Sequence, residues 1–166
     1  MHILFAKISW FLLIVILYMR PLAEITGSKE LRQIMPMRKH LGIACGVTAF
    51  LHVVLYMIDS GILLTYFTDG IFWSFANLFG WGNIAFVALM IPFLTSNRAS
   101  QKYFKNRWKK LQMFSYLAFI CGGIHVSFAT HAIFVGVVPV VGWAIVWGIA
   151  QYRRSARKEK TISYNR

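Results

Sequence analysis

The sequence has little charge, few acidic residues and few cysteines. Charged residues make up 14% of the 166 residues, and five acidic side chains stand against 18 lysines and arginines, whereas soluble domains carry about 25% charged residues. Hydrophobic residues reach 58%, which excludes a disordered chain and is too high for a basic nucleic-acid-binding domain. Two cysteines are too few for a secreted disulfide scaffold. An apolar chain with a strong positive charge is typical of membrane proteins.

Five apolar segments predict an all-α integral membrane bundle of about five transmembrane helices. Each is close to the ~20 residues that cross a hydrocarbon core of ~30 Å. No small-x-small cleavage site follows the first, so we interpret it as a helix and not as a signal peptide. The remaining chain is too short for a nucleotide-binding domain of about 100 residues, so we expect a single transmembrane domain over residues 1–166. The segments are about 3–19, 41–58, about 74–95, 111–129 and 132–150.

The basic residues gather in three regions. Five lie between the first and second segments, six between the third and fourth, and six after the fifth, which together are 17 of the 18. With five helices these regions face the same side of the membrane. The positive-inside rule then predicts an external N-terminus and a cytoplasmic basic tail over residues 151–166. We expect these cations to contact lipid headgroups and not nucleic acid.

Two histidines, His52 and His125, lie deep inside predicted helices, where an ionisable group is costly and is therefore a candidate for function. Both helices start on the basic side, which places the imidazoles about 16 Å and 22 Å deep at 1.5 Å per residue. Two neutral imidazoles at similar depth suit the axial positions of one haem b iron. Zinc is disfavoured because the pair lacks further ligands. The alternative is that each histidine only bonds to a neighbouring backbone.

Small residues precede both deep histidines at helical spacing. Cys45 and Ala49 lie on one helix and Gly122 on the other, and they would let a porphyrin approach the backbone closely. The same residues also suit plain packing between membrane helices. Arg38 is a candidate to meet haem propionates if a haem lies nearer the basic side.

The other histidines are weaker candidates. His40 lies at the basic boundary, and the residue at its pairing position on the later helix is Gln112, a poor iron ligand. His131 lies near the opposite boundary and could contact a partner or a propionate. His2 is terminal and carries no interpretation. No Ser-His-Asp set or pair of carboxylates can be assembled inside the bundle, so the sequence does not support hydrolytic chemistry.

Two stretches of the sequence carry motifs at fixed spacing. MRKHLGI at residues 37–43 is followed by LHVVLY at 51–56, and LTSNR at 94–98 is followed by RWKKLQ at 107–112. They resemble the Arg-Arg-x-Leu-Gly-Leu … Leu-His-x-x-x-Tyr and Leu-Thr-Ser-x-Arg … Trp-x-x-Leu-His-x-x-x-Tyr patterns of the ferric reductase-like transmembrane domain family. Within that family the chain looks like the haem-binding membrane subunit of the bacterial periplasmic methionine sulfoxide reductase system.

The resemblance covers about residues 36–130 and implies a haem b electron carrier of the bacterial inner membrane. His52 and His125 match haem-ligand positions of the family. Gln112 stands where the family has a histidine, so we expect one haem, nearer the outer face, and no second one.

The resemblance also implies redox partners. The chain lacks the flavin and NAD(P)H domain that larger members carry, so we expect an electron-transfer subunit and not a complete oxidoreductase. Its donor would be a separate cytoplasmic flavin or NAD(P)H-linked protein, or a quinol, and its acceptor an external reductase. FMN or a quinone could bind to the chain weakly or to a partner. The alternative is a non-redox membrane scaffold that has lost the haem relay.

Overall fold

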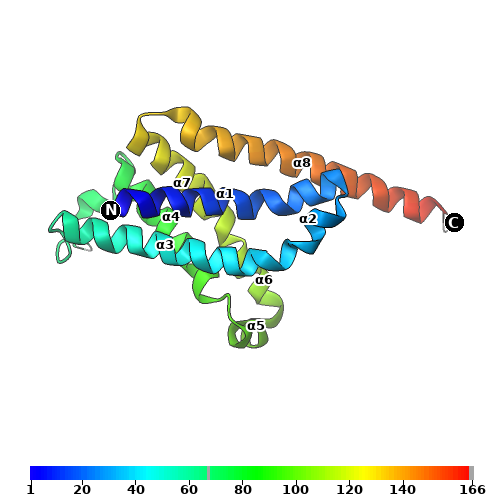
Figure 1. Cartoon of the computed structure of the whole chain (residues 1–166), viewed down its shortest axis with the longest axis horizontal. Helices are drawn as coiled ribbons and strands as arrows, with labels where there is room; N and C mark the ends of the chain where they lie inside the picture. The colour runs from blue at the N-terminus through cyan, green and yellow to red at the C-terminus, as the bar shows by residue number, and fades with distance from the viewer. Residues whose placement is uncertain (67, 165–166) are drawn as a thin grey trace.

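The computed structural model describes the backbone of residues 1–66 and 68–164, and side chains as far as residue 157. Within these residues every regular element is helical, and five long helices form a bundle joined by short ones (Figure 1). The long helices are α1 (His2–Thr26), α3 (Arg38–Asp59), α4 (Leu78–Leu94), α7 (Phe114–Thr130) and α8 (Ile133–Tyr164). The short helices are α2 (Lys29–Gln33), η1 (Met35–Met37), η2 (Gly70–Trp73), α5 (Arg98–Phe104), η3 (Lys105–Arg107) and α6 (Trp108–Gln112).

The helices confirm the expected multi-pass membrane architecture. Four helical stretches are long and apolar enough to cross a bilayer, and α4 is an additional, shorter apolar helix. With 17 residues, α4 is about 25 Å long at 1.5 Å per residue, slightly less than a typical hydrocarbon core. The four stretches are His2–Thr26, Lys29–Asp59, Arg98–Thr130 and Ile133–Arg157.

The first and last helices are longer than their apolar segments predicted. The segment predicted over 3–19 continues to Thr26, and Gly27 ends it in the left-handed conformation at φ 69°, which glycine adopts without steric cost. The helix predicted over 132–150 continues to Tyr164, because the basic tail contains no glycine or proline and is rich in strong helix formers. The tail predicted over 151–166 is thus helical as far as it is described.

The third helix begins later than the predicted residue 74. The side chain of Asn77 accepts hydrogen bonds from the backbone N–H groups of Phe79 and Gly80 and so caps α4. An asparagine at this position satisfies donors that the first turn of a helix leaves unpaired. Residues before Asn77 therefore belong to the connection between α3 and α4 and not to a span.

The helices pack so that α3 and α7 share few direct contacts. α1 packs on α3 and α8, α7 packs on α4 and α8, and α3 also contacts α4. The core is made of aliphatic, small and aromatic side chains from all five helices, with Phe119 fully buried and stacked on Trp10 at a centroid distance of 5.1 Å. Its most buried members include Leu17, Cys45, Ala88 and Ala118.

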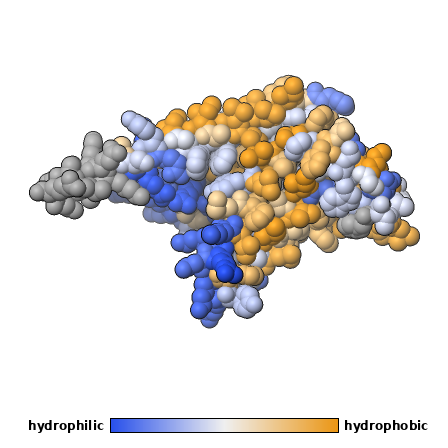
Figure 2. All heavy atoms as spheres, turned by 180° about the vertical axis from the view of Figure 1, so that it is seen from behind, coloured by the Kyte–Doolittle hydropathy of each residue, from blue (hydrophilic) through white to orange (hydrophobic). Residues whose placement is uncertain are grey.

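The outside of the bundle is apolar, as expected for a protein in lipid. Figure 2 shows hydrophobic atoms over the middle of the molecule and hydrophilic atoms gathered toward the end that carries the C-terminal helix. Large apolar side chains on several helices are exposed on the surface of the bundle, for example Phe11 at 64% and Ile145 at 58% exposure. In water such a surface would be costly, whereas in a bilayer it costs nothing.

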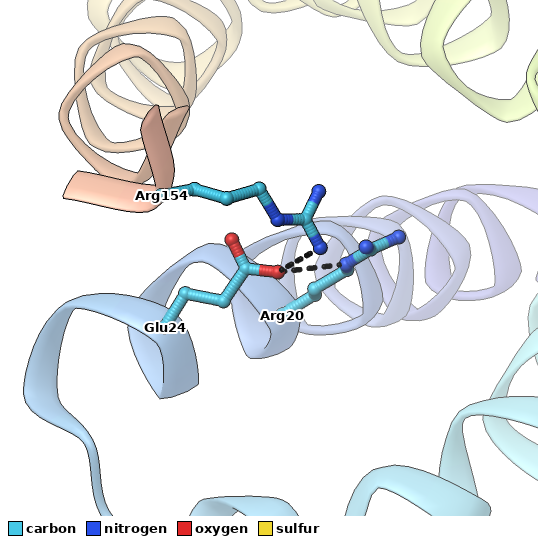
Figure 3. Close-up of polar contacts among 3 residues, drawn as sticks. All are labelled: Arg20, Glu24 and Arg154. Atoms are coloured by element: carbon cyan, nitrogen blue, oxygen red, sulfur yellow. Dashed lines mark hydrogen bonds and ion pairs between the residues drawn. The ribbon is translucent and has the colours of Figure 1, made fainter. Parts of the chain in front are cut away.

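One end of the bundle, here called the basic end, holds the connections that carry the cations. The carboxylate of Glu24 in α1 accepts hydrogen bonds from Arg20 at 3.1 Å and from Arg154 in α8 at 3.2 Å (Figure 3). Arg153 donates to the carbonyl of Ile25 at 2.5 Å. These contacts place the C-terminal tail beside the first connection, as the charge pattern predicts.

The opposite end, here called the histidine end, is covered by the connection between α3 and α4. Tyr66 donates its hydroxyl to the amide oxygen of Asn83, and Asn83 donates to the carbonyl of Phe72 at 2.7 Å. Asn83 is only 4% exposed, and a buried amide with both groups paired is favourable where an unpaired one would be costly. Burial also raises the pKa of the Tyr66 phenol. The connection is therefore a packed cover and not a loose loop.

Candidate haem site at the histidine end

His52 lies on α3, seven residues before the helix ends. Its Nδ1 is 3.1 Å from the backbone carbonyl oxygen of His2, at the start of α1. A carbonyl oxygen can only accept a hydrogen bond, so Nδ1 carries the proton and Nε2 holds the lone pair. The first turn of α1 thus fixes both the tautomer and the orientation of this imidazole.

His125 lies on α7, five residues before the end of that helix. Its Nδ1 is 2.8 Å from the backbone carbonyl oxygen of Leu78, the first residue of α4. The imidazole rests against Gly82, where a Cβ atom would come within 2.7 Å of Nδ1. Only glycine leaves room for the ring at this distance, so α4 both binds and shapes the site of His125.

The two imidazoles lie at the same end of the bundle and at similar depth. Counting from the helix ends, His52 is about 10 Å and His125 about 8 Å inside at 1.5 Å per residue. Both have the same arrangement, with Nδ1–H bound to a backbone carbonyl and Nε2 unprotonated.

Two residues of this site were not identified from the sequence. The ring of His2 is 5.9 Å from the ring of His52, and its Nδ1 is 3.0 Å from the carboxylate of Asp59. This contact holds the start of α1 against the end of α3, where the His2 carbonyl meets His52. Gly82 is the second, and no sequence signal links it to His125, because the two helices meet only in the fold.

The small residues near the histidines serve helix packing in the structure. Cys45 is fully buried, and its thiol donates to the backbone carbonyl of Ser9 in α1 at 3.4 Å. Ala49 is part of the core. At Gly122 an added Cβ would meet the indole of Trp10 at 3.3 Å. Contact between these residues and a porphyrin stays a prediction.

The basic end has a cavity in place of a second pair of imidazoles. Arg38 and Gln112 line this cavity, but His40 does not, and its side chain is exposed. The amide nitrogen of Gln112 donates to the hydroxyl of Thr95 at 3.1 Å. Arg38 lies 14 residues before His52, about 21 Å along α3, so it would meet a propionate only of a haem in this cavity. Its role toward haem stays a prediction.

His131 lies at the histidine end, at the C-terminus of α7. It is exposed and ends α7 in the left-handed conformation, with φ 53°. Its role toward a partner or a propionate stays a prediction. Its backbone allows α8 to follow α7 after a very short turn, as the sequence predicts.

The donors at the histidine end fit an axially ligated haem. Among the described residues no three histidine, cysteine or acidic side chains lie close enough to hold a metal ion by themselves. A haem iron takes four ligands from its porphyrin and needs only two from the protein, and two imidazoles of this tautomer supply them. Ligating histidines commonly donate the other ring N–H to a backbone carbonyl, which is the arrangement at both positions.

Comparison with known proteins places the chain in a family. The model of the ferric reductase-like transmembrane component matches residues 5–123. The match includes α1, α3, α4 and most of α7, and it ends two residues before His125. No solved structure matches the chain. Because the match spans well over half of the sequence, the chain belongs to the ferric reductase-like transmembrane family.

Proposed function

We propose that this protein binds one haem b between His52 and His125 and carries electrons across the membrane. Membership of the ferric reductase-like family supports the electron-transfer role. The observation that carries the haem assignment is the shared tautomer of the two imidazoles, each with Nδ1 on a backbone carbonyl, at 3.1 Å and 2.8 Å. In this tautomer each imidazole keeps the lone pair of Nε2, the atom that would ligate the iron.

Each part of the chain has a defined task in this proposal. When bound, haem b would supply a site that takes up and gives up one electron. α1 and α4 orient the two ligands through the carbonyls of His2 and Leu78. The connection between α3 and α4 closes the histidine end and keeps polar groups paired there.

The placement of charge assigns the two redox partners to opposite sides of the membrane. With the basic end in the cytoplasm, the haem lies nearer the outer face and its acceptor is an external partner reductase. The donor is a cytoplasmic flavin or NAD(P)H-linked protein, or a quinol of the membrane. In both cases the chain is the electron-transfer subunit of an oxidoreductase in a bacterial inner membrane.

The test is the absorption spectrum of the purified protein. The wild type is expected to show the reduced-minus-oxidised α-band of a b-type haem. His52→Ala and His125→Ala should each lose it while helicity is retained, because a single imidazole leaves the iron with one axial position empty. His40→Ala is the matched control, since its side chain is exposed, and should keep the band.

The opposite results would favour the scaffold alternative. A wild type that purifies without haem after expression with sufficient iron and haem precursor would contradict the proposal. So would His52→Ala and His125→Ala variants that retain the full haem content. Either result would leave the bundle as a membrane scaffold whose deep histidines only bind backbone carbonyls.

A further inference from the structure

The cavity at the basic end is a second candidate binding site, distinct from the deep histidines. Its volume is about 350 Å³, and side chains from α1, α3, α4 and α6 contribute to its wall. The interior is mostly apolar, and the lining residues include no histidine. Its apolar members include Leu13, Ile16, Leu89, Pro92 and Phe93.

Two neighbouring cations, Arg38 and Lys39, stand on the wall of this cavity. Arg38 is half-buried and Lys39 is exposed. Among the described residues neither forms an ion pair. The acidic side chains within the described part of the chain all have other partners: Glu24 binds Arg20 and Arg154, Glu30 binds Ser28, Asp59 binds His2, and Asp69 caps η2.

A suitable ligand must therefore bring both an anionic group and an apolar body. We propose that this cavity binds an anionic phospholipid, with its phosphate on Arg38 and Lys39 and the upper part of an acyl chain in the apolar interior. Basic pockets between membrane helices take such headgroups because they combine charge attraction with burial of methylene groups. Free phosphate would use the cations alone and leave the apolar wall unfilled.

Binding is measured by native mass spectrometry of protein in micelles that contain phosphatidylglycerol or phosphatidylcholine with identical acyl chains. The wild type is expected to retain phosphatidylglycerol preferentially. In Arg38→Gln/Lys39→Gln its affinity should fall about tenfold or more, since each cation near an anionic headgroup contributes on this scale. Lys102→Gln/Lys109→Gln is the matched control, because both residues are exposed and neither lines the cavity.

A second variant fills the cavity without touching its charge. Gly42 lines the cavity, and an added Cβ meets nothing within 4 Å. Gly42→Leu should therefore fold, because leucine is a better helix former than glycine, and it should lose phosphatidylglycerol while both cations remain. Equal retention of the two lipids by the wild type would overturn the proposal, as would unchanged binding in both variants.

Two further outcomes identify a different ligand. Displacement of the lipid by millimolar inorganic phosphate would show a simple phosphate site and overturn the lipid assignment. Loss of haem absorbance in Arg38→Gln/Lys39→Gln would show that the cations hold propionates, and would also overturn it. The lipid proposal does not depend on the proposed function, because a protein without haem can still be tested for lipid retention.

Discussion

The two ends of the bundle share helix α3 but carry different chemistry. At the histidine end, α3 and α7 present His52 and His125, each bound to a backbone carbonyl of a neighbouring helix. At the basic end, α3 presents Arg38 and α6 presents Gln112 to an apolar cavity. One end thus carries two imidazoles, and the other carries a cationic and amide lining.

The difference lies in how each end is supported. The imidazoles depend on α1 and α4, whose carbonyls and whose Gly82 shape their surroundings. Gln112 instead donates to Thr95 at the end of α4, which a histidine on a haem iron would not do. Two positions therefore separate the ends, because the cavity at the basic end is lined by Arg38 and Gln112 and, among the described residues, by no histidine.

The largest effect is expected from crowding His125. In Gly82→Ala the new methyl group would lie 2.7 Å from the imidazole Nδ1, so the ring must leave the Leu78 carbonyl. We expect most of the haem to be lost, measured as b-type absorbance per protein. Gly148→Ala is the matched control, since nothing lies within 4 Å of its added Cβ. Full haem content in Gly82→Ala would show that the contact with α4 is dispensable.

The second prediction converts the basic end into a copy of the histidine end. Arg38→His/Gln112→His places two imidazoles on the wall of one cavity, and the haem content should rise from one to two per chain. Gln112→His alone should not add haem, because no second ligand faces it. Haem is quantified against protein concentration. A gain in the single variant would mean that another side chain of the cavity serves as ligand.

A smaller effect is expected at the cover of the histidine end. Asn83→Ala removes the amide that binds both Tyr66 and the carbonyl of Phe72. Leaving buried polar groups unpaired costs about 1–3 kcal/mol, so the melting temperature should fall. Asn106→Ala, at an exposed position, should leave it unchanged. Equal melting temperatures for the two variants would mean that the cover contributes no stability.

The smallest effect is expected at the turn between α7 and α8. His131 has φ 53°, and glycine adopts this conformation at lower cost, by roughly 1 kcal/mol. His131→Gly should therefore unfold at a slightly higher temperature and keep its full haem content. A loss of haem in this variant would place His131 in the site and contradict the assignment of ligands to the deep pair.

Much of the architecture could be predicted from the sequence. Apolar runs near 20 residues locate helices without reference to their packing, and the three basic regions predict which helix ends lie together. The predicted helix boundaries were less accurate. Asn77 begins α4 and Gly27 ends α1 through caps that hydropathy does not report. The tail beyond residue 150 is helical for reasons of propensity and not of hydropathy.

The candidate site could be predicted only in part. His52 and His125 stand out because ionisable groups are costly in a bilayer. His2 and Gly82 do not, since one is near a terminus and the other has no side chain. Their roles come from α1 and α4 meeting α3 and α7, which are contacts between residues 43 to 57 positions apart in the chain. No local pattern encodes such a contact.

The sequence by itself determined that this protein lies in a membrane, where its helices run, and which two histidines could hold a haem. These follow from composition and from the cost of charge in an apolar medium. Only the tertiary structure decided the tautomer of each imidazole, the cover of the histidine end and the cavity at the basic end. The reason is physical: orientation and free volume arise from side chains and carbonyls of different helices packing at short distance.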